Sequence, residues 1–306
     1  MKRNEEVAAF VYDGKIEGEK VEIFYGNILN KDSLKKAVDK ADVIYHLAAV
    51  VDYLAPRNLM FNVNVLGTKN LMELSKGKKV IYLSSTAVMG RNFKQLPADE
   101  KTSCNPSNYY GWTKLQAEKI VKENNGIIIR SADVFGPGFT EGYNYIISKL
   151  EDETLPIIGD GKNFIQWIHI DDLVQALILT KENGKPGEVY IVAGKEVKTL
   201  KECWNLLCKH LGVEPPKRQI SKFAAKTLSF FDLFGSKIKG KRPDVIPEYI
   251  DKITSNRTFD ISKAKRELEF EPKIGYEQAA REMVEEYKKL KEEEDKVAEK
   301  QGEQES

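Results

Sequence analysis

The sequence predicts an α/β protein in which a mostly parallel sheet carries helices on both faces, with a smaller lobe towards the carboxyl end. Apolar runs typical of strands alternate with helical patterns between residues 7 and 192, which is the pattern of a doubly wound parallel sheet. A length of 306 residues is enough for one large α/β domain and a smaller lobe.

Each expected strand is an apolar run that ends in a polar or glycine-containing segment. The expected strands are 7–11, 21–25, 43–47, 80–83, 127–129 and 189–192. The expected helices are 32–40, 56–76, 109–124, 173–179 and 199–211. Asn30 or Asp32 is expected to cap the first helix, and Asp171 or Asp172 the helix at 173–179, because short polar side chains satisfy free amides there.

Composition limits the classes of partner. Charged residues make up 31% of the chain but balance to a net charge of +1, which argues against a nucleic-acid surface. Cys104, Cys203 and Cys208 show neither metal-ligand spacing nor a paired framework, so we expect no metal site and a cytoplasmic location. No apolar run approaches the ~20 residues that cross a bilayer, and no signal-peptide pattern opens the sequence. We therefore expect a small-molecule partner and no stable membrane insertion.

The stretch from Lys79 to Lys114 holds the strongest chemical pattern. A strand-type run ends in Ser84-Ser85-Thr86, at the carboxyl end where open α/β sheets bind ligands. The helix that follows places Tyr110 and Lys114 on one face. Tyrosine titrates near ~10, and an ammonium one turn away favours its phenolate. Tyr110 is thus placed to exchange a proton with a substrate oxygen that Ser85 holds.

The Tyr-x-x-x-Lys spacing alone is weak support for this site. It also occurs at Tyr145/Lys149 and at Tyr287/Lys291, so a single match is close to chance. Only the pair at 110 and 114 follows a buried-type strand that ends in Ser-Ser-Thr. We expect the other two pairs to be surface tyrosines beside solvated lysines.

Leu83-Ser-Ser-Thr-Ala-Val-Met-Gly90, followed by Tyr110-x-x-x-Lys114, resembles the extended short-chain dehydrogenase/reductases of the NAD-dependent epimerase/dehydratase superfamily. This resemblance implies a Rossmann-like core with a smaller carboxyl-terminal substrate lobe and a nicotinamide cofactor. It also implies a catalytic set of Ser85, Tyr110 and Lys114, with Thr86 as the alternative to Ser85. Tyr110 and Lys114 would contact the cofactor as well.

One part of the family pattern is not found. Residues 1–40 contain no G-x-x-G-x-x-G turn, and the segment 7–30 resembles the family's second and third strands. We expect the first strand, its glycine-rich turn and its helix to be absent, from a truncated gene product rather than a divergent inactive form. Because that strand lies in the middle of the order 3-2-1-4-5-6, the strands at 7–11 and 21–25 should be separated from the rest. Weak or absent binding of nicotinamide cofactor is also expected.

Other segments carry the remaining cofactor signals. Gly26-Asn27-Ile28 falls where the family places Gly-Asp-Ile/Leu against the adenine, and His46-Leu47-Ala48-Ala49 resembles a stretch beside the cofactor. Arg130–Pro137 resembles the turn near the nicotinamide. The cofactor contacts implied are Asn27, Ile28, Leu47, Ala48, Ala49, Ser84, Tyr110, Lys114 and Val134. His46 itself is expected to be a packed core histidine, and Asn64 to brace the active-site strands.

Three functions remain open: an oxidoreductase on a secondary alcohol or ketone, a sugar-nucleotide epimerase or dehydratase, and a cofactor-deficient pseudoenzyme. Sugar-nucleotide members usually carry an arginine shortly after Gly-Asp-Gly, where this chain has Ile165. Gly159-Asp-Gly-Lys-Asn163 and the stretch 46–53 look more like the 3β-hydroxysteroid dehydrogenase/dihydroflavonol reductase branch. Tyr12 stands where an arginine would meet a 2′-phosphate, so NAD is slightly favoured over NADP.

The resemblance also suggests how the chain is divided. Residues 1–157 and 173–195 would form the cofactor-binding core, 158–172 and 196–289 the substrate lobe, and 290–306 a charged disordered tail. The aromatic-rich stretch 223–234 would line a substrate cavity, touch a membrane surface, or be the ordinary apolar face of a lobe helix. A homodimer is expected through the helices at 58–76 and 110–124.

Overall fold

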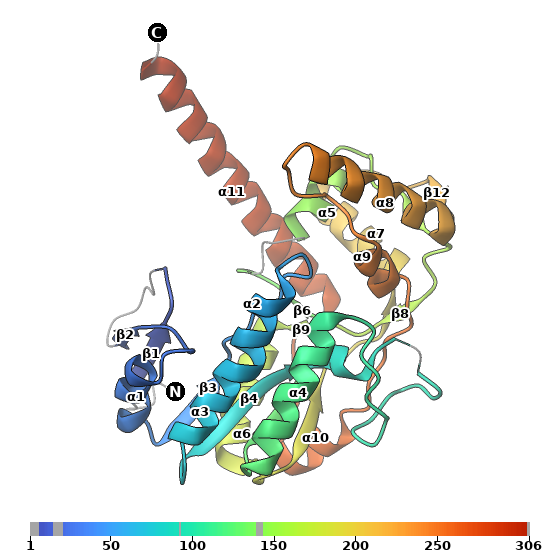
Figure 1. Ribbon diagram of the computed structural model, residues 1–306. Coiled ribbons are helices and arrows are strands. Elements are labelled where there is room, and N and C mark those ends of the chain that lie inside the picture. Colours follow the sequence, from blue (N-terminus) through green and yellow to red (C-terminus); the bar gives the residue numbers. More distant parts are fainter. Residues whose placement is uncertain (1–5, 15–20, 92, 139–142, 305–306) are drawn as a thin grey trace.

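The structure is a computed structural model that describes residues 6–14, 21–91, 93–138 and 143–304 (Figure 1). Its central sheet has four parallel strands in the order β10-β5-β4-β3. These strands are β3 (Val43–His46), β4 (Lys79–Ser85), β5 (Ile127–Ser131) and β10 (Val189–Val192). The Rossmann-like α/β fold expected from the sequence is confirmed.

Helices cover both faces of this sheet, which is why β5 is apolar at consecutive positions rather than alternating. Figure 1 shows α3 (Thr68–Leu74) and α4 (Tyr109–Glu123) on one face, with α6 (Ile170–Asn183) and α10 (Ser262–Leu268) on the other. Ile129 of β5 packs in the core on the α6 and α10 side, and its neighbour Ile128 packs with Val121 of α4. The central strands β4 and β5 are therefore covered on both sides.

The first two strands stand apart, as expected. β1 (Val7–Val11) and β2 (Val21–Tyr25) form a parallel two-stranded sheet that pairs with none of the other described strands. Helix α1 (Lys31–Lys40) follows, capped by Asn30, whose side chain accepts hydrogen bonds from the amides of Asp32 and Ser33. A small apolar cluster joins this unit to α3 and β3; its members are Phe10, Ile28, Leu34, Val38, Ile44, Val63, Leu71 and Leu74.

The helical pattern expected from 56 to 76 forms one continuous run with a widened middle. It consists of α2 (Arg57–Phe61), a π-helical segment η1 (Asn62–Gly67) and α3. A π segment inserts extra width into a helix, and such insertions are frequent at functional sites. Here the π segment contains the buried Asn64.

A second core lies towards the carboxyl end. Helices α5 (Tyr143–Glu151), α7 (Leu200–Leu211) and α11 (Tyr276–Gln304) pack around Trp167 and Trp204. Three short strand pairs surround it: β6–β9 (Val134–Phe135, Ile168–His169), β7–β12 (Ile157–Ile158, Gln219–Ile220) and β8–β11 (Phe164–Ile165, Lys198–Thr199). Helices α8 (Lys222–Ile238) and α9 (Pro247–Ile253) complete the described part. No helix within it is long and apolar enough to span a bilayer.

The expected cap of α6 is wrong. The helix begins at Ile170, and its N-cap is His169, whose ring accepts a hydrogen bond from the amide of Asp171 at 3.2 Å. Asp172 is buried, and its carboxylate accepts hydrogen bonds from the amides of Lys273 and Ile274 at 2.9 and 3.0 Å. The carboxylate thus anchors a distant loop instead of its own helix.

The segment expected to be a charged disordered tail also differs. Helix α11 continues to Gln304, and its last turns project away from the body of the molecule (Figure 1). The Glu and Lys residues that dominate this segment are good helix formers, and pairs four residues apart add support, as between Lys289 and Glu293. High charge alone did not distinguish a solvated helix from a disordered segment.

Candidate active site

The carboxyl end of β4 and the start of α4 lie together, as the sequence predicted. β4 ends at Ser85 and passes into a 3₁₀ turn, η2 (Thr86–Met89), against which the first turn of α4 packs. Asn108 caps α4 by accepting a hydrogen bond from the amide of Gly111 at 2.7 Å. A Cβ at Gly111 would come within 2.5 Å of the Ala87 carbonyl oxygen, so the close approach of helix and turn requires glycine. This contact brings Tyr110 to Ser85.

Tyr110 is held in its protonated form. Burial raises the pKa of Tyr110 above its ordinary value, and Tyr53 and Asp133 act in the same direction, while the side-chain hydrogen bond with Ser85 opposes them. The rings of Tyr110 and Tyr53 lie with their centroids 6.0 Å apart. At neutral pH this tyrosine therefore carries a proton that it can donate to an oxygen.

The Lys114 side chain is buried against β4. Its ammonium donates a hydrogen bond to the Leu83 carbonyl at 2.7 Å and lies 4.1 Å from the centroid of the Tyr82 ring. Burial lowers the pKa of Lys114 to about 7, with Glu118 acting in the opposite direction. The expected lowering of the Tyr110 pKa by Lys114 is not found in this structure, because burial outweighs it and the ammonium interacts with other groups.

Ser84, expected among the cofactor contacts, belongs to a buried network. Its hydroxyl donates to the Glu118 carboxylate at 2.6 Å, and the same carboxylate binds the guanidinium of Arg130. Ser84 is 3% exposed. The structure therefore gives this side chain a role in joining β4 to α4, whereas Ser85 faces Tyr110.

The other expected cofactor contacts lie along the carboxyl ends of β2, β3 and β5. Leu47 and Ala48 are exposed, Ala49 is half-buried, and Val134 of β6 is half-buried. The Asn27 carboxamide accepts a hydrogen bond from the amide of Leu29 at 2.9 Å. Ile28 is buried in the small cluster beneath α1. Leu47, Ala48 and Ala49 form a short apolar strip directly after β3, and the two alanines are small enough to allow close approach.

Two further expectations are confirmed. His46 is a packed core residue whose Nε2 lies 2.8 Å from the Thr68 hydroxyl, and burial, aided by Lys114, lowers its pKa to about 3. Asn64 is 1% exposed and exchanges hydrogen bonds with the backbone of Val50, accepting from its amide at 2.7 Å and donating to its carbonyl at 3.0 Å. It also donates to Thr113 at 3.0 Å, so it joins the segment after β3 to α4.

The other two Tyr-x-x-x-Lys pairs lie on other helices. Tyr145 and Lys149 belong to α5, and the lysine lies 5.6 Å from the tyrosine ring. Tyr287 of α11 donates a hydrogen bond to Glu151, which also pairs with Lys291 at 2.7 Å. Neither pair belongs to the β4–α4 unit.

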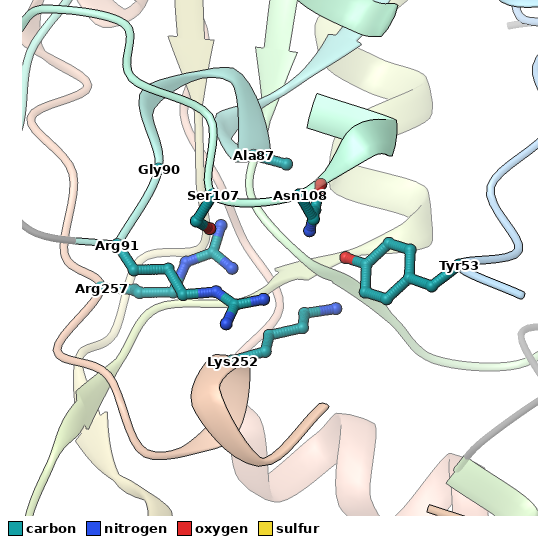
Figure 2. A pocket seen from close by; sticks show the side chains of 8 residues that line it. All are labelled: Tyr53, Ala87, Gly90, Arg91, Ser107, Asn108, Lys252 and Arg257. Atoms are coloured by element: carbon teal, nitrogen blue, oxygen red, sulfur yellow. The ribbon is translucent and has the colours of Figure 1, made fainter. Parts of the chain in front are cut away.

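The structure adds residues that the sequence did not indicate. Arg91, Lys252 and Arg257 converge on a pocket beside Tyr53, next to Tyr110 (Figure 2). Ala87, Gly90, Ser107 and Asn108 complete its lining. The three cations come from the loop after η2, from α9 and from the segment before α10, so no local pattern joins them. In the described part of the chain, no group of three or more His, Cys, Asp or Glu side chains could hold a metal ion.

A Rossmann-like sheet with Ser85, Tyr110 and Lys114 at the carboxyl end of a central strand defines a class of α/β proteins that bind nucleotide cofactors. The comparison with known families gives the same class. The model of the NAD-dependent epimerase/dehydratase family matches residues 2–193, and the chain belongs to this family.

The individual relatives have low sequence identity to this chain, but the alignments cover most of both chains. The chain is 26% identical to 3β-hydroxysteroid-dehydrogenase/decarboxylase isoform 1 of Arabidopsis thaliana, over 89% of this chain and 68% of that protein. It is 27% identical to the N-acetyl-α-D-glucosaminyl-diphospho-ditrans,octacis-undecaprenol 4-epimerase of Escherichia coli O157:H7, over 78% of this chain and 75% of that protein. Among solved structures, dTDP-glucose 4,6-dehydratase from Bacillus anthracis in complex with NAD superposes with a TM-score of 0.70 at 25% identity, over 89% and 81% of the two chains.

The described residues fit one end of a nicotinamide cofactor better than the other. A buried lysine, a protonated tyrosine and the exposed apolar strip at Leu47 and Ala48 suit the ribose and ring of the nicotinamide half. At the other half, α1 is preceded by Asn30, and residues 21–30 of the described chain supply no glycine-rich turn for a pyrophosphate.

Proposed function

We propose that this protein is an NAD(P)-dependent oxidoreductase that acts on a secondary alcohol or ketone. The observation that carries the proposal is the meeting of Ser85 and the protonated Tyr110 at the carboxyl end of β4, with Lys114 buried behind them. Family membership and the similarity to a 3β-hydroxysteroid-dehydrogenase/decarboxylase support it. NAD is slightly favoured, as expected from Tyr12.

The bound cofactor would supply the hydride chemistry, and the chain's own residues supply position and a proton. In the reducing direction, the Tyr110 hydroxyl donates its proton to the ketone oxygen as that oxygen gains negative charge. Ser85 hydrogen-bonds the same oxygen and fixes its position. Lys114 would hold the ribose of the cofactor. Asn27, Ile28, Leu47, Ala48, Ala49 and Val134 belong to the proposal as further cofactor contacts, whereas the Ser84 hydroxyl is already bound to Glu118.

A sugar-nucleotide epimerase or dehydratase is the second candidate. The similarity to a polyprenol-linked sugar 4-epimerase favours it, whereas Ile165 in place of an arginine favours the first candidate. The two candidate reactions differ in their effect on free cofactor. An oxidoreductase changes the redox state of free cofactor during turnover, whereas an epimerase inverts a centre with no net change in cofactor.

The remaining expectations belong to this proposal. Residues 1–157 and 173–195 would bind the cofactor and 158–172 and 196–289 the substrate. A homodimer would pair α2–α3 with α4 across a two-fold axis, which light scattering tests directly. Three free cysteines, Cys104, Cys203 and Cys208, support a cytoplasmic location.

The test screens secondary alcohols with NAD and NADP, and ketones with NADH and NADPH, following cofactor absorbance. Transfer of deuterium from an alcohol labelled at the carbinol carbon to the cofactor would support the oxidoreductase. Inversion of a sugar nucleotide without net reduction would support the epimerase instead. Calorimetric titration showing no binding of any of the four cofactors would overturn both and favour a cofactor-deficient pseudoenzyme.

A further inference from the structure

The pocket beside Tyr110 holds more positive charge than its carboxylates balance. Asp133 pairs with both Lys252, at 3.1 Å, and Arg257, at 3.3 Å. Asp251 pairs with Arg91 at 3.3 Å, and it also binds two lysines of α8. Two carboxylates are therefore shared by five cations, three of which line the pocket (Figure 2).

Donors in this pocket lack partners within the described chain. Arg257 is 6% exposed, and its Nε makes no hydrogen bond. The Nη2 of Arg91 is likewise buried without an acceptor. Burial lowers the pKa of Arg91, and Arg257 nearby acts in the same direction. Buried guanidinium groups with free N–H bonds are costly to the fold, so an external acceptor is the simplest account of them.

The position of the pocket limits which molecule could supply this acceptor. Tyr53 lines the pocket and packs against Tyr110, while Ala87 follows Ser85 by two residues and Asn108 caps α4. The pocket therefore adjoins the position at which a substrate oxygen would meet Tyr110. The space among the lining side chains, with its opening to solvent included, is about 210 Å³, which suits a small polar group rather than a second ring system.

We infer that the substrate carries an oxyanion, a carboxylate or a phosphate, close to the reacting alcohol, and that Arg91, Lys252 and Arg257 bind it. Guanidinium groups match the geometry of both anions by paired hydrogen bonds. This inference rests on the proposed function and narrows its substrate class from secondary alcohols in general to acidic ones.

The first test measures binding without turnover, so its outcome does not depend on the proposed reaction. Calorimetric titration with inorganic phosphate and with acetate, at low ionic strength, should show binding by the wild-type chain. Arg91→Gln should weaken it at least about 10-fold, because a charged hydrogen-bond donor is lost. Its partner Asp251 keeps two lysines, so the fold should persist. Arg281→Gln, which removes an exposed arginine of α11, is the matched control.

Binding of phosphate but not acetate would indicate a phosphate group on the substrate, and binding of acetate but not phosphate would indicate a carboxylate. A second measurement compares a hydroxy acid with its methyl ester as substrates. The acid should have the higher kcat/KM, and Arg91→Gln should remove that preference. Absence of anion binding, or binding that Arg91→Gln leaves unchanged, would overturn the inference even if alcohols are oxidised. Anion binding without any turnover would overturn the proposed function alone.

Helix α8 carries a second feature that the site does not explain. Its large apolar side chains face outward: Phe223, Leu228, Phe230, Phe231, Phe234 and Ile238 are each 59–81% exposed. The small residues Ala225, Ser229 and Ser236 face the protein instead. The apolar face of this lobe helix is therefore exposed, and none of these residues lines the pocket beside Tyr110.

Charged residues at the end of α8 indicate which kind of surface its exposed apolar side chains contact. Lys237, Lys239 and Lys241 are exposed and form no ion pair with a described residue. The only acidic residue of α8, Asp232, accepts hydrogen bonds from the amides of Asp244 and Val245, at 2.8 and 3.1 Å. A stripe of aromatic side chains beside free lysines is the pattern of a helix that lies in the interface of an anionic membrane. We propose that α8 docks reversibly on an anionic lipid surface.

Cosedimentation with lipid vesicles tests this proposal. The chain should bind vesicles of phosphatidylcholine with phosphatidylglycerol and bind phosphatidylcholine alone more weakly. The double variant Phe230→Ser/Phe231→Ser, and the triple variant Lys237→Glu/Lys239→Glu/Lys241→Glu, should each reduce binding at least about 10-fold. Tyr12→Ser changes an exposed aromatic residue elsewhere and is the control. Unchanged binding in both variants, or a dimer in light scattering that Phe230→Ser/Phe231→Ser dissociates, would overturn the proposal.

Discussion

Glu118 of α4 binds the guanidinium of Arg130 of β5 through two hydrogen bonds, from Nε at 3.0 Å and from Nη2 at 2.7 Å. Both side chains are almost completely buried. Glu118 also accepts the hydroxyl of Ser84 and lies one helical turn beyond Lys114. The ion pair therefore fixes the helix that carries Tyr110 and Lys114 to the two strands beneath it.

Removing one member of this pair should destabilise the protein strongly. In Glu118→Gln the guanidinium of Arg130 remains buried but loses its counter-charge, which typically costs about 3–5 kcal/mol. Urea denaturation should show the loss. Asp39→Asn, which breaks the exposed pair of Lys35 and Asp39, is the control and should change stability by less than about 1 kcal/mol. Equal effects in the two variants would show that the buried pair does not hold α4 in place.

His46 should make stability depend on pH in the acidic range. Its folded pKa of about 3 lies below the 6.5 of the unfolded chain, so the unfolded state takes up a proton first as the pH falls. Its contribution is fully present above about pH 6.5 and decreases towards pH 3. From about pH 7 to about pH 5 the wild type should lose about 2 kcal/mol more than His46→Asn. Urea unfolding of both proteins at each pH measures the difference, and parallel profiles would contradict it.

The separate β1–β2 sheet should open more easily than the central sheet. Two strands share few hydrogen bonds, and Val7 and Tyr25 are more than half exposed. Backbone amides of β1 and β2 should therefore exchange with deuterium at least about 10-fold faster than those of β4 and β5. Native-state hydrogen exchange resolved by residue is the measurement. Equal protection in the two sheets would mean that they unfold as one unit.

The β4–α4 unit was predictable because each of its determinants is local. An apolar run, the Ser-Ser-Thr cluster and a Tyr–Lys spacing all lie within Lys79–Lys114, and the structure folds them into the expected strand, turn and helix. The separation of β1 and β2 was also predictable, because it follows from strand order. The first prediction rests on neighbouring residues, and the second on the order of strands along the chain.

Features that depend on distant residues were not predictable. Asp172 resembled a helix cap, but its partners are the amides of Lys273 and Ile274, about a hundred residues later. Arg91 and Arg257 meet only because the chain returns to the active site near its carboxyl end. The pKa of Tyr110 rises through burial, which a Tyr-x-x-x-Lys spacing does not report. Contacts and desolvation of this kind are properties of the folded chain.

The central prediction concerns the Tyr110 hydroxyl. Tyr110→Phe removes one oxygen and leaves the ring packed against Tyr53, so circular dichroism and thermal unfolding should match the wild type. Because the proton donor is lost, turnover of a substrate found by screening alcohols and ketones should fall by at least about 10²–10⁴-fold, with little change in KM. Tyr145→Phe and Tyr287→Phe keep the same spacing to a lysine but lie on α5 and α11, so their turnover should stay near that of the wild type. Wild-type turnover in Tyr110→Phe, or a comparable loss in either control, would show that proton transfer depends on another group and that the β4–α4 unit is not the catalytic centre.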